Sequence, residues 1–379
     1  MTPTQSAPPA RIVGVKSYGY DWANLHGLSM ATAADRLVSH GVGWVLVQND
    51  LDPLPGSAVD QRPPGGGYDD RAFRELLRDR GRTVLESTSV FFAPDEFAAR
   101  RSSRPVGSDG RVFTPFGWYV GICPSDPVYL ARKAERIAEV VERFDPDGIF
   151  VSFIRFPGFW ELWMPETRRA DIVEYCFCAR CLALFQDQTG HDLPAGDPVR
   201  VLTGALRREW TAWKCGMVAR AVGVLRAAAR SVKPDVEVLL NGFGLGGDDY
   251  GNAVEEVLGQ RFADLDPVVD HYELMFYFQI QRRDPAQWIP RRVAEARRQS
   301  SRTVLACLQG GAEYLEPQYA VGRRAREITD AEWRSALRAS AQSRADGVLV
   351  YSWRDLLADE ARGGGRVRAL REYREGLLG

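Results

Sequence analysis

Residues 147–163 read DGIFVSFIRFPGFWELW, a short apolar run that ends in an aromatic-rich segment. The run GIFVSFI is rich in β-branched and aromatic residues and is bounded by Asp and Pro, as is typical of a β-strand. Its apolar residues are almost continuous, which indicates a strand that is buried on both faces of a parallel sheet. The stretch therefore predicts an α/β protein in which helices cover the sheet.

Similar apolar runs recur along the chain and alternate with amphipathic stretches. We expect strands at residues 12–18, 44–48, 83–91, 148–154, 236–240, 269–277, 303–308 and 347–353. We expect helices at residues 31–40, 70–80, 127–144, 205–232, 252–263, 290–299, 330–345 and 365–378. Eight strand–helix units in succession predict an α/β fold of the (β/α)8 TIM-barrel type.

The alternative architecture is a doubly wound open sheet. Its dinucleotide fingerprint is absent, because GFGLGG at residues 242–247 is followed by acidic residues where a phosphate would bind. The segments 50–68, 93–119 and 157–200 are predicted to be long loops. In a barrel such loops lie at the C-terminal ends of the strands, where active sites are found.

Composition bounds the class of protein. With 45% hydrophobic residues, the 379-residue chain can bury a large core, so we expect one barrel domain over residues 11–379. Residues 1–10 are expected to be a disordered lead, and residues of about 157–200 a cysteine-containing insertion. A net charge of -1 gives no long-range attraction to nucleic acid or to a membrane surface. No secretory signal pattern is present, so a cytoplasmic location is expected, and whether the chain forms a homodimer stays open.

Four cysteines form a candidate metal site. Cys176, Cys178 and Cys181 make a C-x-C-x-x-C pattern, and Cys123 precedes them in CPSDP. Four thiolates bind zinc tetrahedrally and leave no open position, so a zinc ion here would be structural. The alternatives are a metal-free cluster of buried thiols, or His191 as the fourth ligand. Cys215 and Cys307 are expected to be core residues.

Two segments carry a resemblance to a known group of enzymes. Residues 123–157, CPSDPVYLARKAERIAEVVERFDPDGIFVSFIRFP, resemble a segment of hypothetical glycoside-hydrolase-like barrel proteins, whose strand reads DGI-x-x-D-[YF]-IR-[FY]-P. Residues 248–278 are similar to a second segment of those proteins, D-[FY]-G…GQ…VD…PM-x-Y. The four cysteines also resemble the zinc cluster of family 42 β-galactosidases. The resemblance implies a TIM barrel, a structural zinc ion and a carbohydrate substrate.

One position departs from that pattern. The resembling strands carry an aspartate where this chain has Ser152. A serine hydroxyl cannot replace a carboxylate as a general acid or nucleophile without an activating base. The activity that the resemblance implies therefore has to depend on other carboxylates.

Glycoside hydrolysis needs two carboxyl groups, one that protonates the leaving oxygen and one that attacks or activates water. The candidate catalytic residues follow predicted strands, and they are Glu161, Glu313, Asp249 and Glu273. Asp249 matches the aspartate of the D-[FY]-G motif, and Glu273 shares a strand face with Met275 by the period of two. The alternative roles of all four are capping, ion pairing or surface solvation.

Aromatic and polar residues at the predicted strand ends are the candidate substrate contacts. They are Lys16, Tyr18, Asp21, Trp22, Ser152, Arg155, Trp160, Asn241, Tyr277 and Trp353. Aromatic rings with a few polar groups suit a concave ligand site, although such rings also pack loops around a barrel mouth. For Arg155 the alternative is a buried ion pair with Asp147 or with an acid on a neighbouring strand.

These observations favour an enzyme that hydrolyses O-glycosidic bonds with two carboxylates at a barrel mouth. A non-catalytic carbohydrate-binding barrel is the alternative, motivated by Ser152. A lyase or isomerase that acts on a sugar is a third interpretation, which rests on the fold alone.

Overall fold

The computed structural model describes residues 11–55 and 68–378. The expected disordered lead at residues 1–10 lies outside the described residues, as does part of the predicted loop 50–68.

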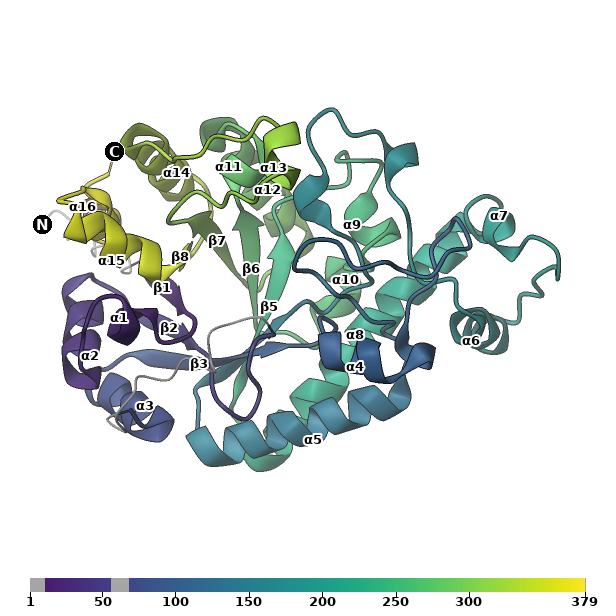
Figure 1. Cartoon of the computed structure of the whole chain (residues 1–379), viewed down its shortest axis with the longest axis horizontal. Helices are drawn as coiled ribbons and strands as arrows, with labels where there is room; N and C mark the ends of the chain where they lie inside the picture. The colour runs from purple at the N-terminus through teal and green to yellow at the C-terminus, as the bar shows by residue number, and fades with distance from the viewer. Residues whose placement is uncertain (1–10, 56–67, 379) are drawn as a thin grey trace, which may run out of the picture.

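Eight parallel strands form a closed barrel (Figure 1). They are β1 (Ile12–Ser17), β2 (Trp44–Val47), β3 (Thr83–Ser89), β4 (Gly148–Ser152), β5 (Glu237–Phe243), β6 (His271–Phe276), β7 (Thr303–Gln309) and β8 (Gly347–Tyr351). The strands follow one another in sequence order, and β1 pairs with both β2 and β8. This closure confirms the TIM barrel and excludes the open sheet, and all eight expected strands are present.

Helices surround the barrel (Figure 1). The longer ones are α2 (Met30–Ser39), α3 (Asp70–Asp79), α5 (Pro127–Phe144), α6 (Ala179–Thr189), α8 (Arg207–Val232), α12 (Pro285–Gln299), α14 (Asp330–Gln342), α15 (Trp353–Ala361) and α16 (Arg366–Arg374). Local sequence explains their ends. Asp126 caps α5 by accepting hydrogen bonds from the backbone N–H groups of Val128 and Tyr129, and Pro127 occupies the first turn, where no N–H is needed.

The shorter helices lie in the connections. They are α1 (Asp21–Asn24), α4 (Pro94–Ala99), η2 (Arg101–Ser103), η3 (Trp160–Leu162), η4 (Arg169–Asp171), α7 (Pro198–Leu202), α9 (Ala253–Glu256), α10 (Phe262–Leu265), α11 (Phe278–Gln281) and α13 (Gln318–Val321). The predicted loop 157–200 is thus not irregular throughout, because η3, η4 and α6 lie within it.

Two further predictions differ from the structure. The helix expected at 252–263 is two short helices, α9 and α10, because Gly259 between them adopts a left-handed backbone with φ of 76°. Trp353 was expected to end a strand, but it begins α15. Ser352 and Asp355 form a capping box that starts this helix, so the helical N-terminal signal overrides the apolar run before it.

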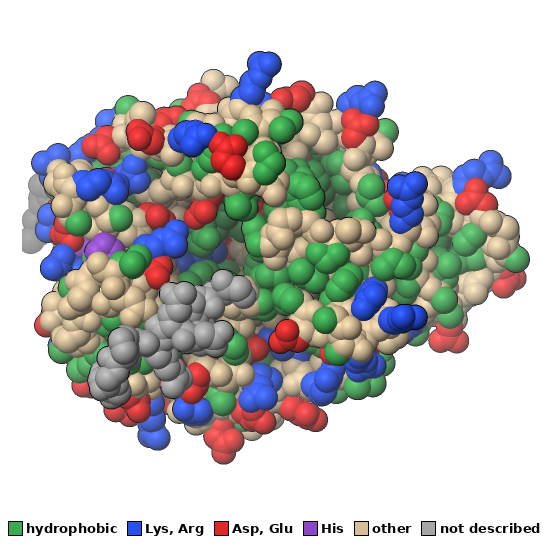
Figure 2. Space-filling view, viewed as in Figure 1, with side chains coloured by type: hydrophobic (Ala, Val, Ile, Leu, Met, Phe, Trp, Pro, Cys, Tyr) green, Lys and Arg blue, Asp and Glu red, His purple; other side chains and the backbone are tan. Residues whose placement is uncertain are grey.

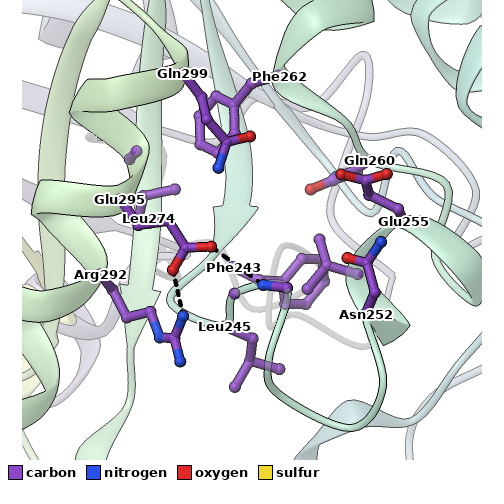
Figure 3. A pocket seen from close by; sticks show the side chains of 14 residues that line it. Phe243, Leu245, Asn252, Glu255, Gln260, Phe262, Leu274, Arg292, Glu295 and Gln299 are labelled. Atoms are coloured by element: carbon purple, nitrogen blue, oxygen red, sulfur yellow. Dashed lines mark hydrogen bonds and ion pairs between the residues drawn. The ribbon is translucent and has the colours of Figure 1, made fainter.

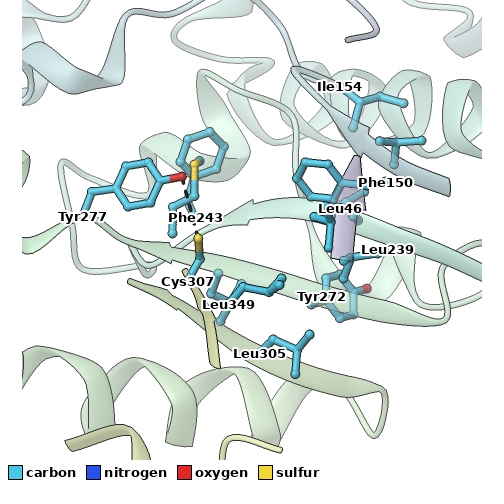
Figure 4. Packing of buried hydrophobic residues seen from close by; sticks show 14 of the residues in the cluster. Leu46, Phe150, Ile154, Leu239, Phe243, Tyr272, Tyr277, Leu305, Cys307 and Leu349 are labelled. Atoms are coloured by element: carbon cyan, nitrogen blue, oxygen red, sulfur yellow. Dashed lines mark hydrogen bonds between the residues drawn. The ribbon is translucent and has the colours of Figure 1, made fainter. Parts of the chain in front are cut away.

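The core fills the barrel and the layer between strands and helices. Phe150, Leu239, Leu305 and Leu349 belong to one large cluster of buried side chains, part of which Figure 4 shows. Phe150 and Ser152 share one face of β4 and both line a cavity, so the barrel interior continues from the core into that cavity. In the described part of the chain, no helix is long and apolar enough to cross a membrane.

Candidate active site

A cavity of about 430 Å³ lies at the C-terminal ends of the strands. Its aromatic lining consists of Tyr18, Phe92, Trp118, Phe150, Phe153, Trp160, Tyr277, Tyr314, Tyr319 and Tyr351. Its polar lining consists of Lys16, Ser152, Arg155, Glu161, Asn241 and Glu313. Figure 2 shows a hollow on this face of the molecule with hydrophobic side chains along one side. A concave, mostly apolar site with a few polar groups has the character of a small-ligand site.

Glu161 is the most perturbed carboxyl group in this cavity. It lies on η3, just after β4, and its residue is only 6% exposed. Its Oε2 atom has no hydrogen-bond partner in the described part of the chain. Burial raises the pKa of Glu161 to about 7, although the Arg155 guanidinium acts in the opposite direction. This carboxyl group can therefore hold a proton near neutral pH and donate it, as a general acid must.

Glu313 is the second carboxyl group that lines the cavity. It follows β7 and is half-buried, and its nearest cation is Arg354, whose Nη2 lies 3.8 Å from Oε1. Burial and then the charge of Asp355 raise the pKa of Glu313 above its ordinary value. Glu161, Glu313 and Tyr319 all line this cavity. The structure therefore brings the two glutamates into one cavity.

Glu273 is fully buried and is not among the residues that line the cavity. Its buried carboxylate lies 2.8 Å from Lys16 Nζ and accepts a hydrogen bond from Asn241 Nδ2. Lys16 Nζ is also 3.3 Å from Tyr277 Oη. Burial acts to lower the pKa of Lys16, but Cys307 and Glu273 outweigh it and raise the pKa above its ordinary value. Glu273 therefore serves as the ion-pair partner of Lys16, which was the alternative role considered for it.

The structure does not bring Asp249 to this cavity. Its carboxylate lies 2.8 Å from Arg283 and 3.0 Å from Arg292 and accepts a hydrogen bond from the Gly246 N–H. Arg292 also lines a separate hollow of about 40 Å³ beside β5, where it forms an ion pair with Glu295 (Figure 3). That volume is far below the usual range for a ligand pocket.

Most of the predicted substrate contacts line the cavity, namely Lys16, Tyr18, Ser152, Arg155, Trp160, Asn241 and Tyr277. Asp21, Trp22 and Trp353 do not. The Trp22 ring stacks on Phe73 in the core, with centroids 5.0 Å apart, and Trp353 Nε1 donates a hydrogen bond to His40. Both tryptophans therefore pack inside the protein and do not face the cavity. Packing was the alternative role considered for the aromatic residues at the strand ends.

Ser152 ends β4 with its side chain on the cavity face. Its hydroxyl group donates a hydrogen bond of 2.8 Å to the backbone carbonyl of Thr88 on the neighbouring strand β3. An aspartate at this position would place a carboxylate in the cavity. The departure from the resembling strands is therefore a change within the candidate site.

Some lining residues were not among the predicted contacts. Tyr351 stacks on Tyr277, with centroids 5.4 Å apart, and the period of two along β8 from Leu349 could have indicated it. Tyr319 comes from α13, a four-residue helix without a periodic signal. Cys307, expected to be core, is indeed buried, and its Sγ lies 3.8 Å from Tyr277 Oη (Figure 4).

The four predicted zinc ligands meet in the structure. The sulfur atoms of Cys123, Cys176, Cys178 and Cys181 all lie within 4.8 Å of one another. Cys123 Sγ is 3.4 Å from Cys181 Sγ and 3.8 Å from Cys178 Sγ. Tetrahedral zinc with Zn–S bonds of about 2.3 Å separates its sulfur ligands by about 3.8 Å, so the cluster fits such an ion. His191 is not part of the cluster, because its ring stacks on Phe185.

No protein family model and no curated protein matches the sequence. The fold, however, is similar to that of several solved structures. The PgaB (BpsB) glycoside hydrolase domain from Bordetella bronchiseptica is 17% identical, with a TM-score of 0.67 over 96% of this chain and 99% of that one. This chain therefore shares its fold with a glycoside hydrolase domain.

Two further structures support this statement. The catalytic domain of a β-amylase from Paenibacillus polymyxa is 10% identical, with a TM-score of 0.63 over 97% of this chain and 98% of that one. A catalytic mutant of a family 42 β-galactosidase from G. stearothermophilus is 11% identical, with a TM-score of 0.63 over 98% of this chain and 57% of that one. At these identities the likeness establishes a shared fold, and the activity has to be argued from the site.

Proposed function

We propose that the chain is a glycoside hydrolase that cleaves an O-glycosidic bond in the aromatic cavity, with Glu161 as the general acid. The observation that carries this proposal is the Glu161 carboxyl group, which is buried in the cavity, has an atom without a partner among the described residues and has a pKa of about 7. A buried acid poised near neutral pH is what protonation of a leaving oxygen requires. The similarity to glycoside hydrolase barrels supports the same reaction class.

Glu313 is the second carboxyl group of the proposed reaction. Glu161 gives its proton to the glycosidic oxygen as the bond to the anomeric carbon breaks, and the leaving sugar departs as an alcohol. Glu313 either attacks the anomeric carbon to form an ester that water then hydrolyses, or accepts a proton from a water molecule that attacks this carbon directly. Arg354, 3.8 Å from Glu313 Oε1, favours the charged form that both roles need and acts against the burial that raises the pKa of this carboxyl group.

The aromatic lining supports a carbohydrate substrate. Trp118 is 39% exposed at the cavity, while Trp160 and Tyr277 are buried within it and lie with ring centroids 5.9 Å apart. Such rings can cover the apolar faces of a sugar, and Asn241 and Lys16 can bind its hydroxyl groups. A buried polar group left unpaired by the wrong ligand would cost affinity, which gives the site its selectivity.

The proposal is tested with a panel of aryl glycosides and oligosaccharides. Glu161→Gln and Glu313→Gln should each lower kcat by on the order of 10²- to 10⁴-fold. Glu166→Gln is the matched control, because Glu166 lies in the same segment but is exposed and paired with Arg282 at 2.7 Å. Hydrolysis that survives at the wild-type rate in both cavity variants would contradict the assignment.

Ser152 favours a second function, a barrel that binds carbohydrate without cleaving it. Here the position that carries an aspartate in the resembling strands is a serine bonded to the Thr88 carbonyl. Saturable oligosaccharide binding without product formation, at a pH where Glu161 is protonated, would support this function over hydrolysis.

We further propose that Cys123, Cys176, Cys178 and Cys181 hold a structural zinc ion. With four thiolates it would have no open position, so it would fix the cysteine-containing segment and take no part in the chemistry. Ser125 Oγ lies 3.1 Å from Cys123 Sγ and the Val106 N–H donates to Cys176 Sγ, contacts that orient the ligands. Metal analysis of freshly prepared protein should give about one zinc per chain, and less than about half would contradict the proposal.

A further inference from the structure

Arg155 is a buried cation that faces the cavity. It is 3% exposed and lies just after β4 in the segment that leads to Glu161. Both of its hydrogen bonds come from Nη1, to the Gly158 carbonyl and to Tyr119 Oη at 3.4 Å. Its Nε and Nη2 atoms donate to no protein acceptor in the described part of the chain. These two atoms form the edge of a guanidinium that binds a carboxylate with two parallel hydrogen bonds.

No carboxylate within the described residues forms an ion pair with Arg155. Asp147, its expected partner, instead accepts a hydrogen bond from the Val84 N–H at 2.7 Å. Two other buried arginines are paired: Arg74 lies 2.9 Å from Asp70, and Arg292 lies 3.0 Å from Asp249. An unpaired buried charge is costly, so the absence of an ion pair at Arg155 needs a reason.

Aromatic rings supply only part of that reason. The Arg155 guanidinium lies 4.9 Å from the Tyr119 ring centroid and 5.6 Å from that of Phe243. Cation–π contacts offset some of the desolvation of a guanidinium, but they leave its hydrogen-bond donors unused. The free edge can therefore still bind an anion that enters the cavity.

The other charges near Glu161 do not neutralise Arg155. Lys16 is paired with Glu273 at 2.8 Å, which leaves neither of them to balance the cavity. Arg324, a second buried cation near Glu161, donates to the carbonyls of Glu161 and Ile280 and forms no ion pair in the described ranges. With Glu161 protonated, this side of the cavity carries excess positive charge.

We propose that Arg155 binds the carboxylate of an acidic sugar, so that the substrate class is a glycoside of a uronic acid. The planar carboxylate would accept hydrogen bonds from Nε and Nη2 and supply the missing negative charge. This inference rests on the proposed glycoside hydrolase function and names the residue that selects its substrate.

The test is calorimetric titration of the full chain with D-glucuronate, D-galacturonate, the matched neutral sugars glucose and galactose, and glucose 6-phosphate. Free monosaccharides are not cleaved, so binding is measured apart from hydrolysis. At least one uronate should bind about 10- to 100-fold more tightly than its neutral counterpart, as expected for charge-assisted hydrogen bonds.

Substitutions test whether Arg155 is the residue that causes the preference for uronates. Arg155→Met should reduce uronate affinity to that of the neutral sugar, while Arg155→Lys should retain part of the preference. Arg168→Met is the control, because Arg168 is an exposed arginine of the same segment paired with Asp171. If Arg155→Met does not fold, the affinities of the wild-type protein for uronates and for neutral sugars still test whether the site prefers a carboxylate.

Three results would overturn the proposal: equal affinity for uronate and neutral sugar, a uronate preference that survives in Arg155→Met, or tighter binding of glucose 6-phosphate than of either uronate. Hydrolysis of neutral glycosides without uronate preference would overturn this inference and leave the proposed function standing. Uronate binding without hydrolysis of any uronide would support the Arg155 assignment and contradict the hydrolase.

Discussion

At the scale of single residues, the site depends on the different environments of three glutamates. Glu161 is buried without an ion pair within 4 Å among the described residues, Glu313 is half-buried, and Glu273 is held by Lys16. Environment separates the protonation behaviour of chemically identical groups, and that separation is what assigns acid and base roles. Glu161 is the group that can be both protonated and available to a ligand.

The raised pKa of Glu161 predicts a loss of activity on the alkaline side of the pH–rate profile. Because the general acid must be protonated, kcat/KM for a glycoside should fall as the pH rises above about 7. A pH–rate profile measures this, and a rate that stays constant from pH 6 to pH 9 would rule out Glu161 as the acid.

The raised pKa of Glu161 also predicts that its ionised carboxylate destabilises the folded state. The folded pKa of about 7 lies above the unfolded value of 4.5, so the folded state binds more protons and stability falls as pH rises between these values. Glu161→Gln should therefore be more stable than the wild type by up to about 3 kcal/mol at pH 8. Urea unfolding at pH 8 and pH 4 checks this, since at pH 4 the advantage should vanish.

For the Lys16–Glu273 pair we predict that a substitution lowers the stability of the folded state. Lys16→Met would leave the Glu273 carboxylate buried without its cation and should cost about 3–5 kcal/mol of unfolding free energy. Combining Lys16→Met with Glu273→Leu should recover much of that loss, because the isolated charge is then gone. An additive double variant would mean that the two side chains do not depend on each other.

At the scale of elements, the segment between β4 and α8 carries both the acid and the cysteine cluster. Cys178 caps α6 and Cys181 lies in its first turn, while Cys123 comes from the chain before α5. A metal there would connect two segments that are distant in sequence. Removing it should loosen α6 more than the barrel strands, because the strands are held by their own ladder.

Hydrogen exchange measures this difference. A chelator, or Cys181→Ser, should speed amide exchange in α6 and in the neighbouring residues 101–107, with little change in β5 to β8. Cys215→Ser is the control, because Cys215 is a buried cysteine outside the cluster. Equal acceleration in both regions would show that the cluster stabilises the whole barrel.

At the scale of the whole molecule, the barrel was predictable because each strand has an apolar run and clear boundaries. The apolar run and the amphipathic pattern located strand β4 and helix α5 within two residues. The split of 252–263 was missed because a left-handed glycine inside an amphipathic pattern has no periodic signature. The start of α15 was missed because its capping box directly follows a strand.

Part of the site was predictable from single features of the sequence. Ser152 was indicated by the resemblance, and the face that Glu273 shares with Tyr277 follows from the period of two. Burial in the loops does not, so sequence could not distinguish the cavity-lining Glu161 from Asp249, which two arginines hold elsewhere. The partners of a loop residue come from distant segments, and a single sequence does not contain that information.

The central claim is that Glu161 protonates the leaving group of a glycoside. The most direct test compares Glu161→Gln with the wild type on aryl glycosides whose leaving phenols range from strongly to weakly acidic. The account predicts a loss of on the order of 10²- to 10⁴-fold for the weakly acidic phenols and a much smaller loss for the most acidic ones, which need no proton. A loss of the same size across the series, or none, would contradict it.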